Sequence, residues 1–112
     1  MDKLAVRNIG TISFITTDDI SYVEGAGNYC QIYTKDGKRF MPRITVKALS
    51  ARLSENFIRV AHSYIINTDC LLELNSELGR YSIARLSCGK ELRISPRRYR
   101  QSLERYLAEV LI

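Results

Sequence analysis

The 112-residue chain lacks the long apolar run that a membrane span requires. A transmembrane helix needs about 20 consecutive apolar residues, and no segment approaches that length. The first residues, MDKLAVRN, also lack the apolar centre of a secretory signal peptide. We therefore expect a protein of the cytoplasm that does not associate with membranes.

Cysteine and histidine are both scarce. Cys30, Cys70 and Cys88 form no CxxC pair, and His62 is the only histidine. Structural zinc sites combine cysteine and histidine ligands at short paired spacings, so we expect no metal site, and we expect no other cofactor. The odd number of scattered cysteines favours reduced thiols in a reducing compartment, with Cys30 and Cys70 half-buried.

Motifs of catalysis are missing as well. His62, Ser63 and Asp69 are residue types found in hydrolases, but no nucleophile elbow or oxyanion glycine accompanies them. His62 and Ser63 are adjacent, so in a strand their side chains would point to opposite faces. Gly25 and Gly27 are not followed by the GxGxxG or Walker spacing of a nucleotide-binding loop. The sequence predicts a protein that is not an enzyme.

What the chain does carry is a concentration of positive charge. The whole sequence has a formal net charge of +5, but residues 79–105 alone carry +6. Their basic members are Arg80, Arg85, Lys90, Arg93, Arg97, Arg98, Arg100 and Arg105. Such a cluster is typical of a polyanion partner, since arginine binds phosphate and guanine through two parallel hydrogen bonds. The alternative interpretation is that the basic cluster is a solvated face that keeps the protein soluble and binds no partner.

Short runs of alternating polarity, separated by turn residues, dominate the rest of the sequence. Examples are TISFIT at 11–16, NYCQIYT at 28–34 and RYSIARLS at 80–87. Their content of Val, Ile, Tyr and Thr favours β-strands. Helical spacing occurs at 45–53 and at the C-terminus, where we expect Ser95 as cap and Pro96 as first helical residue. We predict one mainly-β domain over residues 1–112.

The expected start of the C-terminal helix has an unusual charge. Arg97, Arg98 and Arg100 would lie near the positive end of the helix dipole, where each cation costs about 0.3–1 kcal/mol relative to a favourable placement. Helix stability alone does not favour this arrangement. A bound anion would neutralise the arginines, and free backbone N–H groups at a helix start also bind phosphate. The arginines at the helix start therefore indicate a polyanion partner, as the net charge of residues 79–105 does.

Three blocks of the sequence together resemble the LytTR family of DNA-binding domains. They are DDISYVEGAGNYCQIYTKDG at 18–37, TVKALSARLSENFIRVAHSYIIN at 45–67 and LRISPRRYRQSL at 92–103. The resemblance covers residues 4–107. It implies an elongated stack of small antiparallel sheets with a short central helix and a C-terminal helix. It also implies the role of such domains in bacterial response regulators, which is transcription regulation through loops that contact DNA.

The resemblance further implies which residues contact DNA. Base edges in the major groove would be reached by Asn28 and Tyr29 in a first loop, His62 in a second and Arg97 in a third. Contacts to the DNA backbone would come from their neighbours Arg43, Lys47, Ser63, Tyr64 and Arg98. Arginine, with asparagine, histidine or tyrosine assisting, carries the hydrogen-bonding groups that base edges require. Family members bind tandem repeats in duplex DNA, which implies a protein that is monomeric in solution and paired on DNA.

Two features depart from the family pattern. Ala61 and His62 precede Ser63, which places the histidine one position later than is common, and Pro96 directly precedes Arg97. No receiver domain with a phosphoacceptor aspartate precedes these blocks. We therefore expect either an effector domain of a longer regulator or a protein that stands alone.

Other interpretations of single residues stay open. His62 also suits a hydrogen-bonded position at a strand edge, Tyr29 suits a cross-strand aromatic pair, and Asn67 suits a turn. The alternative to duplex DNA is RNA, bound by a small basic β-domain whose tyrosines stack on bases. The tyrosines available for this are Tyr22, Tyr29, Tyr33, Tyr64 and Tyr81.

Overall fold

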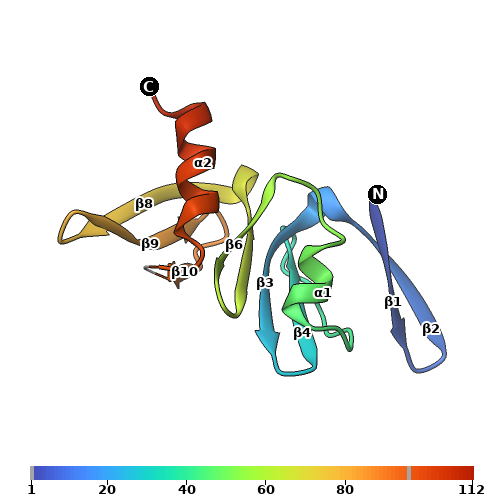
Figure 1. The fold of residues 1–112 in the computed structure, drawn as a ribbon. Helices are drawn as coiled ribbons and strands as arrows, with labels where there is room; N and C mark the ends of the chain where they lie inside the picture. The colour runs from blue at the N-terminus through green and yellow to red at the C-terminus, as the bar shows by residue number, and fades with distance from the viewer. Residues whose placement is uncertain (1, 96) are drawn as a thin grey trace.

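The computed structural model describes residues 2–95 and 97–112 as an elongated molecule of 50 × 26 × 24 Å. Its short strands form three antiparallel sheets that follow one another along the long axis (Figure 1). The expected architecture, a stack of small antiparallel sheets with a short central helix and a C-terminal helix, is confirmed. Within the described residues, no helix has the length and apolar character needed to cross a membrane.

The first sheet is a two-stranded hairpin formed by β1 (Lys3–Asn8) and β2 (Thr11–Thr16). Side chains alternate between the two faces of a strand, and this alternation turns Leu4, Val6 and Ile15 towards the rest of the molecule. All three are buried. The hairpin stands at one end of the molecule, next to the central sheet (Figure 1).

The central sheet has five strands in the order β5-β4-β3-β7-β6. They are β3 (Ile20–Ala26), β4 (Tyr29–Thr34), β5 (Arg39–Phe40), β6 (Phe57–Ala61) and β7 (Tyr64–Asn67). A single 3-10 turn, η1 (Thr17–Asp19), leads into β3. Because β3 pairs with both β4 and β7, the β3–β4 and β6–β7 hairpins are joined into one surface.

The short helix α1 (Val46–Ser50) lies within the segment 45–53 that has helical spacing. Its N-terminus is capped by Thr45, whose hydroxyl accepts a hydrogen bond from the Ala48 backbone N–H at 3.2 Å. Val46 and Leu49 are its buried residues. The helix therefore attaches to the central sheet through one narrow apolar side.

The third sheet contains β8 (Leu71–Glu77), β9 (Arg80–Leu86) and β10 (Glu91–Arg93), in the order β10-β9-β8. The 3-10 turn η2 (Thr68–Cys70) connects it to β7. The C-terminal helix α2 (Arg100–Val110) packs against β6, the edge strand of the central sheet. The end of the chain thus returns to the middle of the molecule.

The central sheet carries a hydrophobic core on each face. Along β3, Val23 turns towards α1 and the first sheet, whereas Tyr22 turns towards the third sheet and α2. The first core contains Leu4, Val6, Ile15, Ile20, Val23, Cys30, Ile32, Val46, Leu49 and Ile65. The second contains Tyr22, Ile58, Val60, Ile66, Ala84, Leu86, Leu92, Ile94 and Leu103. Packing on both faces holds the hairpins of the central sheet in place.

Asn67 has the role of a turn former that the sequence suggested. Its side chain is fully buried and caps η2 by accepting a hydrogen bond from the Asp69 backbone N–H at 3.0 Å. Its amide also donates to the Ile20 carbonyl at 2.9 Å. The residue therefore fixes the end of β7 to the beginning of β3.

The C-terminal helix begins later than the sequence indicated. Its cap position is Tyr99, which makes no side-chain cap hydrogen bond, so the expectation that Ser95 caps the helix is wrong. The Ser95 backbone N–H instead donates to the Val60 carbonyl at 2.8 Å, which keeps the chain extended beside β6. The expected role of Pro96 as first helical residue falls outside the described residues.

The cysteines are free, but two of them are more deeply buried than expected. Cys30 and Cys70 are 0% and 2% exposed rather than half-buried, and Cys88 is exposed. The Cys30 thiol donates to the Ile44 carbonyl at 3.1 Å. Burial raises the pKa of this thiol, so that it stays protonated and packs as a small apolar group.

Candidate nucleic-acid interface

The first and second predicted contact loops are two-residue hairpin turns that lie side by side. Gly27 and Asn28 connect β3 to β4, and His62 and Ser63 connect β6 to β7. Because β3 and β7 are antiparallel neighbours, both turns project from the same end of the central sheet (Figure 1). The Gly25 backbone N–H donates to the Ser63 carbonyl at 2.7 Å and so joins the two hairpins directly beneath their turns.

Gly25 also allows α1 to begin beside these turns. A Cβ atom at this position would lie 2.1 Å from Cγ2 of Val46, so the helix packs directly on the backbone of β3. This contact brings Lys47, in the first turn of α1, close to His62. Together they border a hollow of about 270 Å³, the turn hollow, lined by Gly25, Gly27, Thr45, Val46, Lys47, Arg59, His62 and Ser63.

Arg59 connects the second turn to the third predicted contact segment. Its guanidinium group donates to the His62 carbonyl, and its central carbon lies 4.9 Å from the ring centre of Tyr99. Tyr99 directly precedes α2, and the guanidinium group of Arg98 lies 5.6 Å from the same ring centre. All three predicted contact segments are therefore linked, two by the Gly25–Ser63 hydrogen bond and the third through Arg59.

The sequence alone indicated neither a role for Arg59 nor the close packing of α1 on Gly25. The available signal for Arg59 was a charged residue inside the otherwise apolar strand FIRVA. Its Nε atom is buried and, among the residues described, has no hydrogen-bond partner. For Gly25 the sequence offered only the absence of a side chain, since its neighbour Val46 is far away along the chain.

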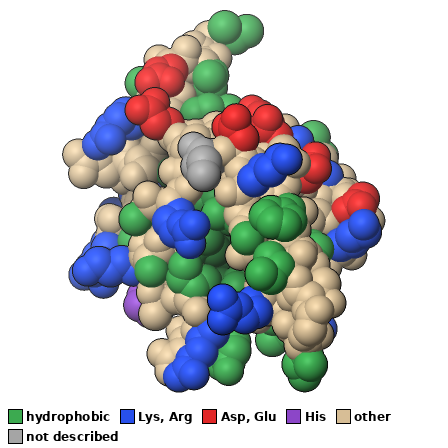
Figure 2. All heavy atoms as spheres, turned by 90° about the vertical axis from the view of Figure 1, so that its right-hand side faces the viewer, with side chains coloured by type: hydrophobic (Ala, Val, Ile, Leu, Met, Phe, Trp, Pro, Cys, Tyr) green, Lys and Arg blue, Asp and Glu red, His purple; other side chains and the backbone are tan. Residues whose placement is uncertain are grey.

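The four residues predicted to reach base edges are all exposed. Asn28 and His62 lie on the turns, Tyr29 begins β4 with 45% of its side chain exposed, and Arg97 lies in the bend before α2. Figure 2 shows the molecule from the side of the first hairpin. On this face the acidic side chains occupy only the upper half. The histidine and several lysine or arginine side chains occupy the lower half, so on this face the positive charge lies towards the side from which the two turns project.

The later start of α2 changes the explanation for Arg97. This residue and Arg98 lie in a bend before the helix, so the expectation that they belong to its first turn is wrong. Only Arg100 is helical, and no acidic residue accompanies it in the first turn. The dipole argument therefore applies to Arg100 most directly. The exposed bend leaves Arg97 accessible without help from the helix.

Three of the predicted backbone contacts, Arg43, Tyr64 and Arg98, do not line the turn hollow. Arg43 follows β5 and lines a separate hollow, together with Arg7 and Arg52. Tyr64 is the first residue of β7. Its side chain packs against the second core, on the face of the central sheet opposite to α1. Burial raises the pKa of the Tyr64 phenol, and the carboxylate of Glu24 raises it further. The phenol therefore stays protonated.

The residue types of a hydrolase are not assembled into a triad. His62 and Ser63 form the β6–β7 turn, as the family resemblance implied for His62, and not part of a strand. Asp69 belongs to η2, which follows the other end of β7. Within residues 2–95 and 97–112, no three His, Cys, Asp or Glu side chains lie close enough together to hold a metal ion.

Comparisons with known proteins identify the family and the fold. Residues 10–108 match the family model described as LytTr DNA-binding domain. A search of the curated proteins gave no match. One similar solved structure is the LytTr DNA-binding domain of a protein from Bacillus cereus, described as a methyl-accepting/DNA response regulator. The TM-score is 0.78 over 96% of this chain and 97% of that chain, at 13% identity, so this likeness concerns the fold alone.

The contact between Gly25 and Val46 can be tested by folding measurements. Gly25→Ala should lower the free energy of unfolding by about 1–3 kcal/mol, because the added methyl group collides with Cγ2 of Val46. Urea denaturation measures the loss. In the matched double variant Gly25→Ala/Val46→Ala the colliding methyl group is gone, so the two losses should not add. Additive losses would contradict the close packing of α1 on β3.

Proposed function

Because the chain belongs to the LytTR family of DNA-binding domains, we propose that it binds duplex DNA sequence-specifically as part of a bacterial transcriptional regulator. Residues 1–112 act as one domain, in the cytoplasm, without catalysis and without a cofactor. The observation that carries this proposal is the linkage of three segments that lie far apart in the sequence, beside the two turns of the central sheet. Each of them exposes a residue able to reach a base edge.

The proposed mode of binding is readout of the major groove through short connections. Arg97 can bind guanine O6 and N7 with two hydrogen bonds, and Asn28 can bind adenine N6 and N7 in the same way. Tyr29 and His62 assist from the two turns. Contacts to phosphates come from Arg43, Lys47, Ser63, Tyr64 and Arg98, and these set the affinity and the register rather than the sequence preference.

RNA binding by base stacking has weaker support. Tyr22 is 7% exposed, and its ring stacks on Tyr33 with a centroid distance of 4.5 Å. These two rings stack on each other and so do not offer a free face to bases. Tyr64 packs against the second core. The remaining candidates, Tyr29 and Tyr81, belong to different sheets. A continuous stacking platform of the kind that single-stranded RNA requires is therefore not supported.

The proposed target is a pair of tandem repeats in duplex DNA. Each repeat accepts one copy of the domain, which is monomeric in solution and pairs with a second copy only on DNA. The effector role in a two-component system would then place the control of pairing in other parts of the regulator.

The duplex proposal predicts a strong dependence of affinity on salt. After selection of bound sequences from a random duplex pool, fluorescence anisotropy should give a linear fall of log affinity with log salt. The slope should be near −0.9 per phosphate contact, and we expect on the order of four to seven contacts per domain. A slope near zero, or equal affinity for single-stranded RNA of the same length, would contradict duplex binding.

His62→Ala should weaken binding to the selected site by about 1–3 kcal/mol, the range for a lost base contact. The melting temperature should stay nearly unchanged, because the side chain is exposed and the turn hydrogen bond uses only the His62 carbonyl. Anisotropy and thermal denaturation measure the two quantities. A large loss of stability with an unaltered site preference would mean that His62 is structural.

Arg97→Ala and Arg105→Ala form a matched pair of exposed arginines, one in the bend before α2 and one within the helix. Arg97→Ala should weaken specific binding by about 1–3 kcal/mol and relax discrimination at one base pair, whereas Arg105→Ala should do neither. Binding to a panel of single-base variants of the selected site measures both effects. An equal loss for all sequences would make Arg97 a phosphate contact instead.

A further inference from the structure

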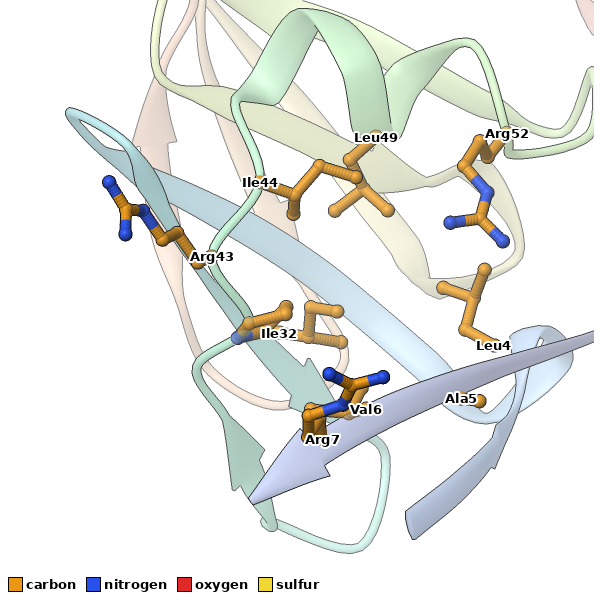
Figure 3. Close-up of a pocket in the computed structure, with 10 residues that line it drawn as sticks. Leu4, Ala5, Val6, Arg7, Ile32, Arg43, Ile44, Leu49 and Arg52 are labelled. Carbon is orange, nitrogen blue, oxygen red and sulfur yellow. The ribbon is translucent and has the colours of Figure 1, made fainter. Parts of the chain in front are cut away.

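A second hollow lies between the first hairpin and the central sheet, away from the two turns. It has a volume of about 460 Å³, within the usual range for sites that bind small molecules. Figure 3 shows that β1, the loop between β5 and α1, and α1 itself surround it. We call it the hairpin hollow. The duplex-DNA proposal assigns it no role beyond a single phosphate contact at Arg43.

The floor of the hairpin hollow is apolar and reaches the first core. It is formed by the side chains Leu4, Val6, Ile32, Ile44 and Leu49. Ile44 is half-buried and the other four are at most 5% exposed. These residues come from four different parts of the chain, so the floor exists only in the folded protein. A ligand that fits this floor needs an apolar body.

The rim of the hollow carries three arginines. In Figure 3 the guanidinium groups of Arg7 and Arg52 reach towards the hollow from β1 and from the turn that follows α1, whereas that of Arg43 points away. All three side chains are exposed. Within the described residues, the ion pairs join Lys38 to Asp36, Arg85 to Glu73 and Arg93 to Glu77, so none neutralises this rim.

This combination of floor and rim defines the chemistry of an occupant. Among the residues that the structure describes, no acidic side chain lines the hollow, so the positive charge of Arg7 and Arg52 is uncompensated there. A guanidinium group binds a carboxylate through two parallel hydrogen bonds, and it does so more strongly beside an apolar surface than in open water. An apolar floor offers no hydrogen bond or charge to a DNA phosphate.

We propose that the hairpin hollow binds a small amphipathic carboxylate. The carboxylate lies between the guanidinium groups of Arg7 and Arg52. The apolar body packs on Ile44, above the nearly covered side chains of Val6 and Leu49. The site is built from this chain alone and does not depend on DNA binding. Because α1 borders both the hairpin hollow and the turn hollow, the two sites share one structural element.

Octanoate is a suitable probe, with octanol and acetate as matched controls. Titration of the ¹⁵N-labelled full chain should give saturable chemical-shift changes at Val6, Ile44 and Leu49. Octanol lacks the charge and acetate lacks the apolar body, so each should bind at least about tenfold more weakly. Equal binding of octanol and octanoate, or shift changes scattered over the whole surface, would overturn the proposal.

Variants separate a carboxylate site from general attraction to a basic protein. The double variant Arg7→Gln/Arg52→Gln should weaken octanoate binding by about tenfold or more, while the circular dichroism spectrum stays unchanged because both side chains are exposed. Compared with each single variant, Arg7→Gln or Arg52→Gln, the control Arg105→Gln removes an equal charge far from the rim in sequence and should have no effect. An equal loss with Arg105→Gln, or none with the double variant, would refute the site. If inorganic phosphate displaced octanoate at equal concentration, the rim would be a plain anion site and the proposal would also fail.

Discussion

The arrangement of the whole turn end depends on one backbone position, Gly25. Its N–H group joins the β3–β4 hairpin to the β6–β7 hairpin through the Ser63 carbonyl, and its missing side chain leaves room for Val46. The first interaction sets the spacing of the two turns, and the second sets where α1 begins. A larger residue at this position would force apart the elements that carry Lys47 and His62. The exposed basic residues therefore rely on a contact between two uncharged groups.

Much of the fold follows from local patterns in the sequence. Alternation along 28–34 indicated a strand, and β4 forms there with Cys30 and Ile32 buried and Gln31 and Tyr33 only partly covered. The helical spacing at 45–53 is realised in α1, and Asn67 ends its strand as a turn former. These features depend on residues that are neighbours along the chain, so propensity and periodicity contain the information.

The features that sequence reasoning missed depend on partners that only folding brings together. The helix α2 begins later than predicted. The Ser95 backbone N–H donates a hydrogen bond to the carbonyl of Val60 in β6, which lies far from Ser95 in the sequence. Arg59 acquires its role from His62 and Tyr99, which approach it from a turn and from the segment before α2. In each case the residue itself was visible in the sequence, but its partner lies too far away along the chain for a local pattern to reveal the contact. The positions of the predicted contact residues could be inferred only through family resemblance.

The shortness of the two hairpin turns has a consequence for the thermodynamics of recognition. A long flexible loop loses backbone freedom when it is fixed against a partner, at roughly 1–2 kcal/mol for each residue that becomes ordered. Here the turns are two residues long, and their flanking strands are already held by ladder hydrogen bonds. Little conformational entropy is left to lose at Asn28 and His62. Association through this end should therefore resemble the docking of a preorganised surface more than folding coupled to binding.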